Sequence, residues 1–244
     1  GAASAVVNMG DAFGRDLVAR LPGATRLVSV SGAGSDAPCA PALLQARRLA
    51  GTDRGQRIGL RAQGERAEFM SPLLGAFNVE NLAVAAGILL AEGFNLQDIA
   101  AALAACNPPP GRMELIGAAA GPQAPQVIVD FAHTPDALRR VLEALRAHAL
   151  ARIWCVFGCG GDRDAGKRPA MGAIARQLAD RIVITDDNPR FEDPDAIVAA
   201  VLAGAGRGPA VEVDRDRAAA IRHAIHSADR EDLVGRREVD LGKL

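Results

Sequence analysis

Three short polar segments of the sequence carry side chains that could bind an anionic or zwitterionic ligand. They are AHTPD (132–136), GCGGDRDAGKRP (158–169) and DNPRFEDP (187–194). Each follows a short run of apolar, β-branched residues and precedes a run with helical periodicity. Because the loops that follow parallel strands meet at one edge of a sheet, we expect the three segments to share one site.

The segment 158–169 matches a phosphate-binding P-loop only in part. From Gly161 onward it reads G-x-x-x-x-G-K, but an arginine follows the lysine where a P-loop has a Ser or Thr that ligates Mg²⁺. Asp162 and Asp164 would also repel a polyphosphate. The segment leads into a helix, with Pro169 suited to the first helical position. Its cations are Arg163, Lys167 and Arg168. It therefore suits a carboxylate or a mixed-charge ligand; a glycine-rich turn whose charges face water is the alternative.

Opposite charges lie close together where the third segment begins. Asp186 and Asp187 end a strand-like run, Asn188 and Pro189 form a turn, and Arg190 follows. Carboxylate and amide oxygens accept hydrogen bonds from an ammonium group, whereas a guanidinium binds a carboxylate through two parallel hydrogen bonds. This combination suits an amino acid zwitterion.

A histidine precedes the helix that starts in the segment 132–136. Thr134 is a typical N-cap residue, Pro135 fits the first helical position, and Asp136 suits the positive end of the helix dipole. His133 is then left at the end of the strand, where an imidazole can stack on a ligand or hydrogen-bond with it. Packing against the edge of the sheet is the alternative role for this histidine.

The elements that position these segments alternate between strand and helix from about residue 125 onward. The strand-like runs are 127–131, 153–157, 181–186 and 210–213. Between them apolar residues recur at helical spacing, as at Leu138, Val141, Leu142 and Leu145. The alternation predicts an α/β fold with a parallel, doubly wound, Rossmann-like sheet. The tail 229–244 is charged and lacks apolar periodicity, so we expect it to be mobile.

The first part of the chain has a different pattern. Residues 5–8 predict a strand and 11–21 a helix, 57–63 and 67–74 predict an antiparallel hairpin around a GER turn, and helices follow at 80–93 and 96–106. The run NPPPG (107–111) stops the last helix. We therefore expect two domains, 1–110 and 111–244, and we expect the segment 111–228 to fold by itself.

Composition argues against several classes of function. A net charge of −1 and a pI near 6.5 provide no general basic face for nucleic acid or an anionic membrane. No apolar run approaches the roughly 18 residues of a transmembrane helix, and the N-terminus shows no signal pattern. The four cysteines form no CxxC pair, which favours reduced thiols. We expect a cytoplasmic, monomeric protein that binds no nucleic acid and does not insert into a membrane.

Five segments, in order, resemble the characteristic segments of the Mur ligases of peptidoglycan synthesis. They are GAFNVENLAVAAG (75–87), PPPGRMELI (108–116), VDFAHTPDAL (129–138), FGCGGDRDAGKRPAMGAIA (157–175) and TDDNPRFEDP (185–194). The resemblance runs from about residue 5 to residue 228. It implies a three-domain enzyme, of which the chain holds the end of the central ATPase domain and most of the Rossmann-like C-terminal domain that binds the amino acid.

The resemblance also implies an activity and a set of binding residues. The activity is that of an ATP- and Mg²⁺-dependent ligase that adds meso-diaminopimelate to UDP-N-acetylmuramoyl-L-alanyl-D-glutamate through an acyl phosphate. The residues implied to approach ATP are Asn78, Arg112 and His133. Those implied to hold diaminopimelate are Arg163, Asp187, Asn188, Pro189 and Arg190. No nucleophile or metal ligand is assigned, because positioning and charge neutralisation carry such a reaction.

The chain departs from this family pattern in several places. It carries no GTNGKT segment, no uridine-nucleotide domain and no GKGHE segment, and NMGD (8–11) stands where the family has NxDD. We therefore expect an incomplete ligase, a fragment or truncated product, that does not hydrolyse ATP alone. The alternatives are a non-catalytic binding module of the same fold and a related folylpolyglutamate or cyanophycin ligase. Arg168 disfavours a P-loop kinase.

Overall fold

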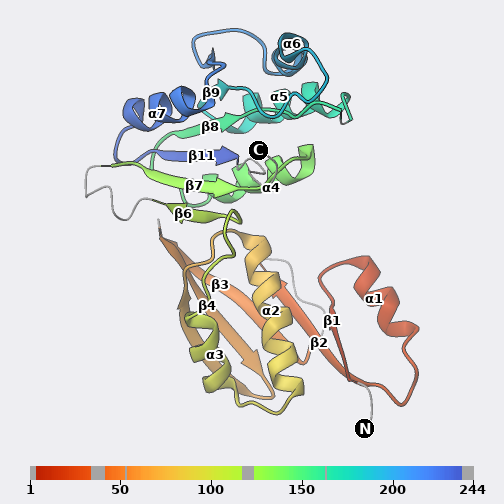
Figure 1. The fold of residues 1–244 in the computed structure, drawn as a ribbon. Helices are drawn as coiled ribbons and strands as arrows, with labels where there is room; N and C mark the ends of the chain where they lie inside the picture. Colours follow the sequence, from red (N-terminus) through yellow and green to blue (C-terminus); the bar gives the residue numbers. More distant parts are fainter. Residues whose placement is uncertain (1–3, 34–41, 53, 117–123, 163, 238–244) are drawn as a thin grey trace. The chain divides into compact units, whose positions relative to one another are not determined.

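The chain forms two compact units, Gly1–Asn107 and Pro108–Leu244, each with its own sheet (Figure 1). The structure is a computed structural model that describes residues 4–33, 42–52, 54–116, 124–162 and 164–237. The division between the units falls at the start of the proline run that follows the last helix of the first unit. No helix within the described ranges is long and apolar enough to cross a membrane.

The first unit is a five-stranded sheet in the order β1-β2-β3-β4-β5. Its elements are β1 (Ser4–Asn8), α1 (Ala12–Ala19), β2 (Arg26–Ala33), β3 (Leu44–Thr52), β4 (Gly55–Ala62), β5 (Glu65–Ser71), α2 (Ala76–Ala91) and α3 (Leu96–Ala104). The first three strands are parallel and the last three antiparallel. Helices α2 and α3 cover one face of the sheet and share its apolar core (Figure 1).

The predicted hairpin is present, but its turn is not the predicted GER. Ala62 pairs with Glu65, so the turn consists of Gln63 and Gly64, whose φ angles are 50° and 87°. A two-residue turn with both φ angles positive matches the twist of the strands that it joins, and glycine adopts such an angle without strain. Strands β2 and β3 were not predicted, because serine, glycine and arginine interrupt their apolar residues.

The second unit is a six-stranded sheet in the order β10-β9-β8-β11-β7-β6. Its elements are β6 (Glu114–Ile116), β7 (Gln126–Asp130), α4 (Pro135–Arg146), β8 (Ile153–Phe157), α5 (Lys167–Leu178), β9 (Arg181–Ile184), α6 (Pro194–Ala205), β10 (Val211–Val213), α7 (Arg217–Ser227) and β11 (Leu233–Arg237). All described strand pairs are parallel except β6 with β7. The predicted α/β class is therefore confirmed, with an antiparallel strand added at one edge.

Alternate residues of β8 face opposite sides of this sheet. Trp154 and Val156 pack against α7, whereas Cys155 and Phe157 lie on the side of α4. Helices on both faces explain why the strand is apolar throughout instead of alternating with polar residues. Burial raises the pKa of the Cys155 thiol to about 12, which makes this free cysteine a core residue rather than a reactive one.

The prediction of a mobile tail is wrong for 229–237, because β11 lies in the middle of the sheet. It pairs in parallel with both β7 and β8 (Figure 1). Leu233 and Val234 are buried, and a Cβ atom at Gly235 would meet the Leu145 side chain at 2.8 Å. The segment 111–228 lacks this strand, so the expectation that it folds by itself is not supported.

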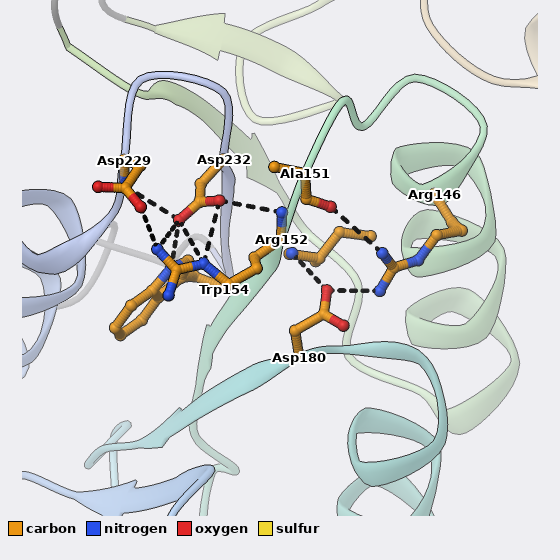
Figure 2. A network of polar contacts seen from close by, with 8 residues as sticks. Arg146, Ala151, Arg152, Trp154, Asp180, Asp229 and Asp232 are labelled. Carbon is orange, nitrogen blue, oxygen red and sulfur yellow. Dashed lines mark hydrogen bonds and ion pairs between the residues drawn. The ribbon is translucent and has the colours of Figure 1, made fainter.

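The buried carboxylate of Asp232 anchors β11 at the amino edge of the sheet (Figure 2). It accepts hydrogen bonds from the backbone N–H of Arg152 (2.9 Å), from Arg152 Nε (3.1 Å) and from Trp154 Nε1 (3.1 Å). Arg152 also reaches Asp229 at 2.6 Å. Burial alone would raise the pKa of Asp232, but the hydrogen bonds, led by that of Arg152, outweigh it and lower this pKa.

A second carboxylate at the same edge, that of Asp180, joins α4 to the start of β8. It accepts from the backbone N–H of Ile153 at 2.7 Å and pairs with Arg146 Nη2 at 2.7 Å (Figure 2). Both networks lie at the amino ends of the parallel strands, opposite the edge at which ligands of such sheets bind.

Candidate functional site

The three polar loops lie at the carboxyl edge of the second sheet, as the sequence predicts. Strands β7, β8 and β9 run in the same direction, and the loops follow their last residues. Strand β11, however, separates β7 from β8, so the loop after β7 lies two strand spacings, about 10 Å, from the loop after β8. The edge therefore carries two groups of loops instead of the one shared site that was expected: residues 111–113 with 131–134, and residues 158–162 and 164–166 with 185–193.

In the first group, Arg112 and His133 contact the same aromatic ring. The Arg112 guanidinium carbon lies 5.5 Å from the Phe131 ring centroid, and the His133 ring centroid lies 5.6 Å from it. His133 Nδ1 donates to the carbonyl oxygen of Phe131 at 3.1 Å. Both polar side chains are exposed. The structure thus brings together two of the three residues predicted to approach ATP, with a cation and an imidazole at one point of the edge.

Asp130, the last residue of β7, holds the two loops of this group together. Its carboxylate accepts from the backbone N–H of Met113 at 2.9 Å and from that of Ala132 at 2.8 Å. Met113 has a φ of 50°, a left-handed conformation that a methionine adopts only when contacts fix it. Asp130 was not among the predicted site residues, although a carboxylate at the end of a buried strand is a signal that the sequence contains.

The third residue of that set, Asn78, belongs to the first unit. It lies in the first turn of α2, where Nδ2 donates to the carbonyl oxygen of Leu74 at 2.7 Å and Oδ1 accepts from Asn81 at 3.0 Å. These contacts hold the start of α2 and keep the amide half-buried.

In the second group, the loops after β8 and β9 touch through their backbones. The N–H of Gly161 donates to the carbonyl oxygen of Asn188 at 2.9 Å. A Cβ atom at Gly161 would lie 1.8 Å from the carbonyl oxygen of Pro189, and one at Gly158 would lie 2.2 Å from that of Thr185. Only glycine allows this approach, so these glycines join two loops instead of forming a phosphate cradle.

Arg168 was predicted to meet the ligand, and the structure contradicts this. The residue is 3% exposed and binds both oxygens of Glu192, at 2.8 and 2.7 Å. Glu192 Oε1 also accepts from the backbone N–H of Asp162 at 2.5 Å. Hydrogen bonding to Glu192 raises the pKa of Arg168, and the same contact lowers the pKa of Glu192. The ion pair thus joins the first turn of α5, which follows the loop after β8, to the loop after β9.

Of two further expectations about the loop after β8, one is wrong and the other concerns a residue that the structure does not describe. Helix α5 begins at Lys167, with Gly166 as its N-cap, so Pro169 is the third helical residue and not the first. Lys167 is half-buried in this first turn. Arg163, predicted to hold diaminopimelate, lies outside the described residues. The N-cap predicted at Thr134 is confirmed, since its side chain accepts from the backbone N–H of Ala137, and Asp193 caps α6 by accepting from that of Asp195.

The loop 187–190 presents Arg190 at the carboxyl edge. Asp187 Oδ1 accepts from the N–H of Asn188 at 2.8 Å, and Asn188 Oδ1 accepts from the N–H of Arg190 at 3.0 Å. Arg190 is exposed and has a φ of 50°. Its guanidinium forms no ion pair with any residue that the structure describes. The predicted grouping of a carboxylate, an amide and a guanidinium is therefore present in one short loop.

Asp186 does not share this role, contrary to the expectation that two adjacent carboxylates are available. Arg215, in the loop after β10, binds Asp186 through Nε at 2.5 Å and also contacts Asp195. Hydrogen bonding to Asp186 raises the pKa of Arg215. Asp186 is thus neutralised within the protein. Arg215 was not among the predicted site residues, because it lies 25 residues beyond Arg190 in the sequence.

Known proteins match the part of the chain that carries both loop groups. The family model "Mur ligase, glutamate ligase domain" matches residues 111–235. A UDP-N-acetylmuramoyl-L-alanyl-D-glutamate–2,6-diaminopimelate ligase of Xanthomonas oryzae pv. oryzae (strain MAFF 311018) is 49% identical over 234 residues, which are 96% of this chain and 46% of the relative. The ligase of the same name from Xylella fastidiosa (strain 9a5c) is 46% identical over 232 residues, 95% of this chain and 46% of the relative.

Solved structures agree with these relatives. A structure of a UDP-N-acetylmuramoyl-L-alanyl-D-glutamate–2,6-diaminopimelate ligase has a TM-score of 0.69 and 34% identity, and the match covers 96% of this chain and 47% of that one. A folylpolyglutamate synthase from Thermotoga maritima, with a TM-score of 0.63 and 20% identity over 86% of this chain and 44% of that one, shares the fold. The chain spans about half the length of the curated relatives that it matches. On these matches, and on the loops that they include, the chain belongs to the Mur ligase family.

Proposed function

We propose that the second unit carries the amino acid site and part of the ATP site of a ligase that adds meso-diaminopimelate to UDP-N-acetylmuramoyl-L-alanyl-D-glutamate. The observation that carries this proposal is the loop 187–190. Arg168 and Arg215, which flank it, are occupied by carboxylates of the protein, whereas Arg190 is exposed at the ligand edge. An exposed guanidinium that forms no ion pair with the described residues is suited to bind the carboxylate of a ligand.

Meso-diaminopimelate has an amino acid group at each end, and the loop matches one of them. Arg190 binds the carboxylate of that end, and the side-chain oxygens of Asp187 and Asn188 accept from its ammonium group. Pro189 fixes the turn between them, and Arg163 is a further cation for the ligand. With one end held, the amine of the other end is directed toward the acyl phosphate.

ATP is assigned to the other group of loops. Arg112 offers a positive charge to phosphate oxygens, and His133 offers a ring that can stack or hydrogen-bond. Asp130 sets the positions of both loops. We assign Asn78 to ATP from the first unit, which we propose to be the end of the ATPase domain. ATP phosphorylates the glutamyl carboxylate; the amine then forms the N–C bond, and the C–O bond to phosphate breaks.

Mg²⁺ enters the proposal together with ATP, and it supplies positive charge to the phosphates. Over the described ranges, no three His, Cys, Asp or Glu side chains gather into a group that could hold a metal ion. We further propose that the protein acts as a monomer in the cytoplasm. The thiols of Cys106 and Cys155 form no disulfide, which is typical of a reducing compartment.

Calorimetric titration of the chain with meso-diaminopimelate and with L-lysine tests this proposal. The two amino acids differ by one carboxylate, so a site built around Arg190 binds the first and discriminates against the second. Glutamate, which carries the extra carboxylate without the distal amine, serves as the second comparison. Equal binding of all three amino acids, or no binding of diaminopimelate, would refute the proposed amino acid site.

A further inference from the structure

The loop that presents Arg190 lies between β9 and α6 and contains no helix or strand. Arg190 has a φ of 50°, and Asp162 in the facing loop has a φ of 49°. The left-handed region is unfavourable for residues with a side chain, so neighbouring contacts must maintain it. What holds these two positions decides where the Arg190 guanidinium lies.

Three hydrogen bonds cross between the two loops. The N–H of Gly161 donates to Asn188 O at 2.9 Å, that of Asp162 to Glu192 Oε1 at 2.5 Å, and that of Phe191 to Asp162 Oδ2 at 3.3 Å. Two of them involve Asp162, the residue with the unfavourable φ. Glu192 and Phe191 directly follow Arg190, so the contacts lie on both sides of the presented arginine.

Arg168 fixes the position of the Glu192 carboxylate. It lies in the first turn of α5, its side chain is 4% exposed, and its two terminal nitrogens bind the two carboxylate oxygens of Glu192. The nitrogen Nη2 also donates to the carbonyl oxygen of Gly160 at 3.3 Å. A planar guanidinium in this fork arrangement fixes the direction of its partner, which a lysine would not do. Helix α5 thereby supports both loops.

We propose that the Arg168–Glu192 pair is the positioning device of the amino acid site. It joins the loops 160–162 and 187–192 into one unit and so orients Arg190 toward the carboxylate of the ligand. This inference rests on the proposed function. It predicts that selection of an amino acid with a carboxylate at its distal end depends on two residues that do not touch that amino acid.

A first test needs no ligand. In Glu192→Gln the carboxylate is lost at constant size, and hydrogen exchange at the amides of 160–162 and 188–192 becomes faster by roughly tenfold or more. Amides of α4 keep their rates. Asp180→Asn is the matched control, because it breaks a partly exposed carboxylate–arginine pair at the opposite edge of the same sheet. Unchanged exchange in both loops of Glu192→Gln overturns the proposal.

A second test measures selectivity. Calorimetry of Glu192→Gln gives an affinity for meso-diaminopimelate that is lower by about tenfold, and a diaminopimelate-to-lysine ratio that moves toward one. Asp180→Asn keeps the wild-type ratio. A merely structural role would lower the melting temperature and leave the ratio unchanged in the folded protein, which is the contrary result. If the wild-type protein does not bind diaminopimelate, the proposed function is refuted. The exchange test still shows whether the Arg168–Glu192 pair holds the two loops together.

Because Glu192→Gln leaves a buried arginine without its charge partner, a second variant guards against unfolding. Arg168→Met with Glu192→Met replaces the pair by apolar side chains, which proteins often tolerate. This double variant folds, yet its exchange in the two loops stays fast and its selectivity stays low, because the N–H of Asp162 has lost its acceptor. Wild-type exchange and selectivity in the double variant overturn the proposal.

Discussion

Arg152 and Asp232 form an ion pair of 2.9 Å in which the Asp232 side chain is fully buried. The two residues are 80 apart in sequence, and the pair fixes the start of β11 against the start of β8. The stability of the second unit therefore depends on the carboxylate of Asp232, which lies in the segment that was predicted to be a mobile tail.

Asp232→Asn should destabilise the protein by about 3 kcal/mol at neutral pH, since it leaves Arg152 without its charge partner and weakens the acceptor of Trp154. The pKa of Asp232 is lowered from its ordinary value of 3.8, so its contribution is present above that value and is lost as the pH falls through the lower folded value. Urea unfolding at pH 7 and near pH 3 measures the difference between wild type and variant. A difference that does not shrink in acid would contradict this assignment.

Arg190→Ala should lower the affinity for meso-diaminopimelate by about a hundredfold, because a charge-assisted pair is lost, and should change lysine binding little. Titration calorimetry with both amino acids measures the ratio. Arg207→Ala removes an exposed arginine elsewhere in the same unit and serves as the control. If the ratio stays at its wild-type value, Arg190 has a structural role and the specificity assignment fails.

Gly161→Ala should push the loops after β8 and β9 apart, because the new Cβ atom would lie 1.8 Å from Pro189 O. We expect an affinity for diaminopimelate lower by about tenfold or more, in line with the cost of overpacking. Gly160→Ala is the control, since its Cβ would meet Asn188 O at 3.4 Å, an ordinary contact. If both variants bind diaminopimelate with equal affinity, the close approach of Gly161 to Pro189 does not contribute to ligand binding.

Asp130→Ala should weaken nucleotide binding by about tenfold, because the loops of Arg112 and His133 lose their shared acceptor. Diaminopimelate binding should not change, since β11 and β8 lie between this strand and the loop of Arg190. Fluorescent ADP displacement and calorimetry measure the two ligands separately. Asp136→Ala, which removes a surface carboxylate paired with Arg140, is the control. Parallel loss of both ligands would mean that the variant disturbs the whole unit.

The chain by itself should not release phosphate from ATP. Its 244 residues contain no GxxxxGK[ST] segment, so they lack the loop that cradles the phosphates and supplies the Mg²⁺-ligating hydroxyl. A phosphate-release assay checks this directly. Steady release that disappears in His133→Ala would contradict the expectation, because a contaminating enzyme would not respond to that change.

The strand-end loops were predictable from sequence because their causes are local. Apolar β-branched runs, the N-cap at Thr134 and the proline at the start of the helix that follows it each involve residues within a few positions of one another. The residue types of the loop 187–190 were then enough to predict a carboxylate, an amide and an exposed guanidinium in one short loop.

The roles of other charged residues depended on contacts that sequence spacing does not show. Arg168 and Arg190 look alike in sequence, yet one is buried against Glu192, 24 residues away, and the other is exposed. Strand β11 was missed for the same reason: its apolar part is short, and its burial comes from β7 and β8, which lie far upstream.

The position of β11 also constrains the order of assembly during synthesis. The middle of the sheet is made from β11, which follows the other described strands in sequence. Strands β7 and β8 therefore leave the ribosome long before their common neighbour and cannot pair through it until β11 has emerged. The nascent unit meanwhile exposes two open strand edges, the feature through which incomplete sheets join one another. Completion of this sheet therefore waits for β11, and a ribosome stalled before that strand would hold a chain whose two inner strand edges are still exposed.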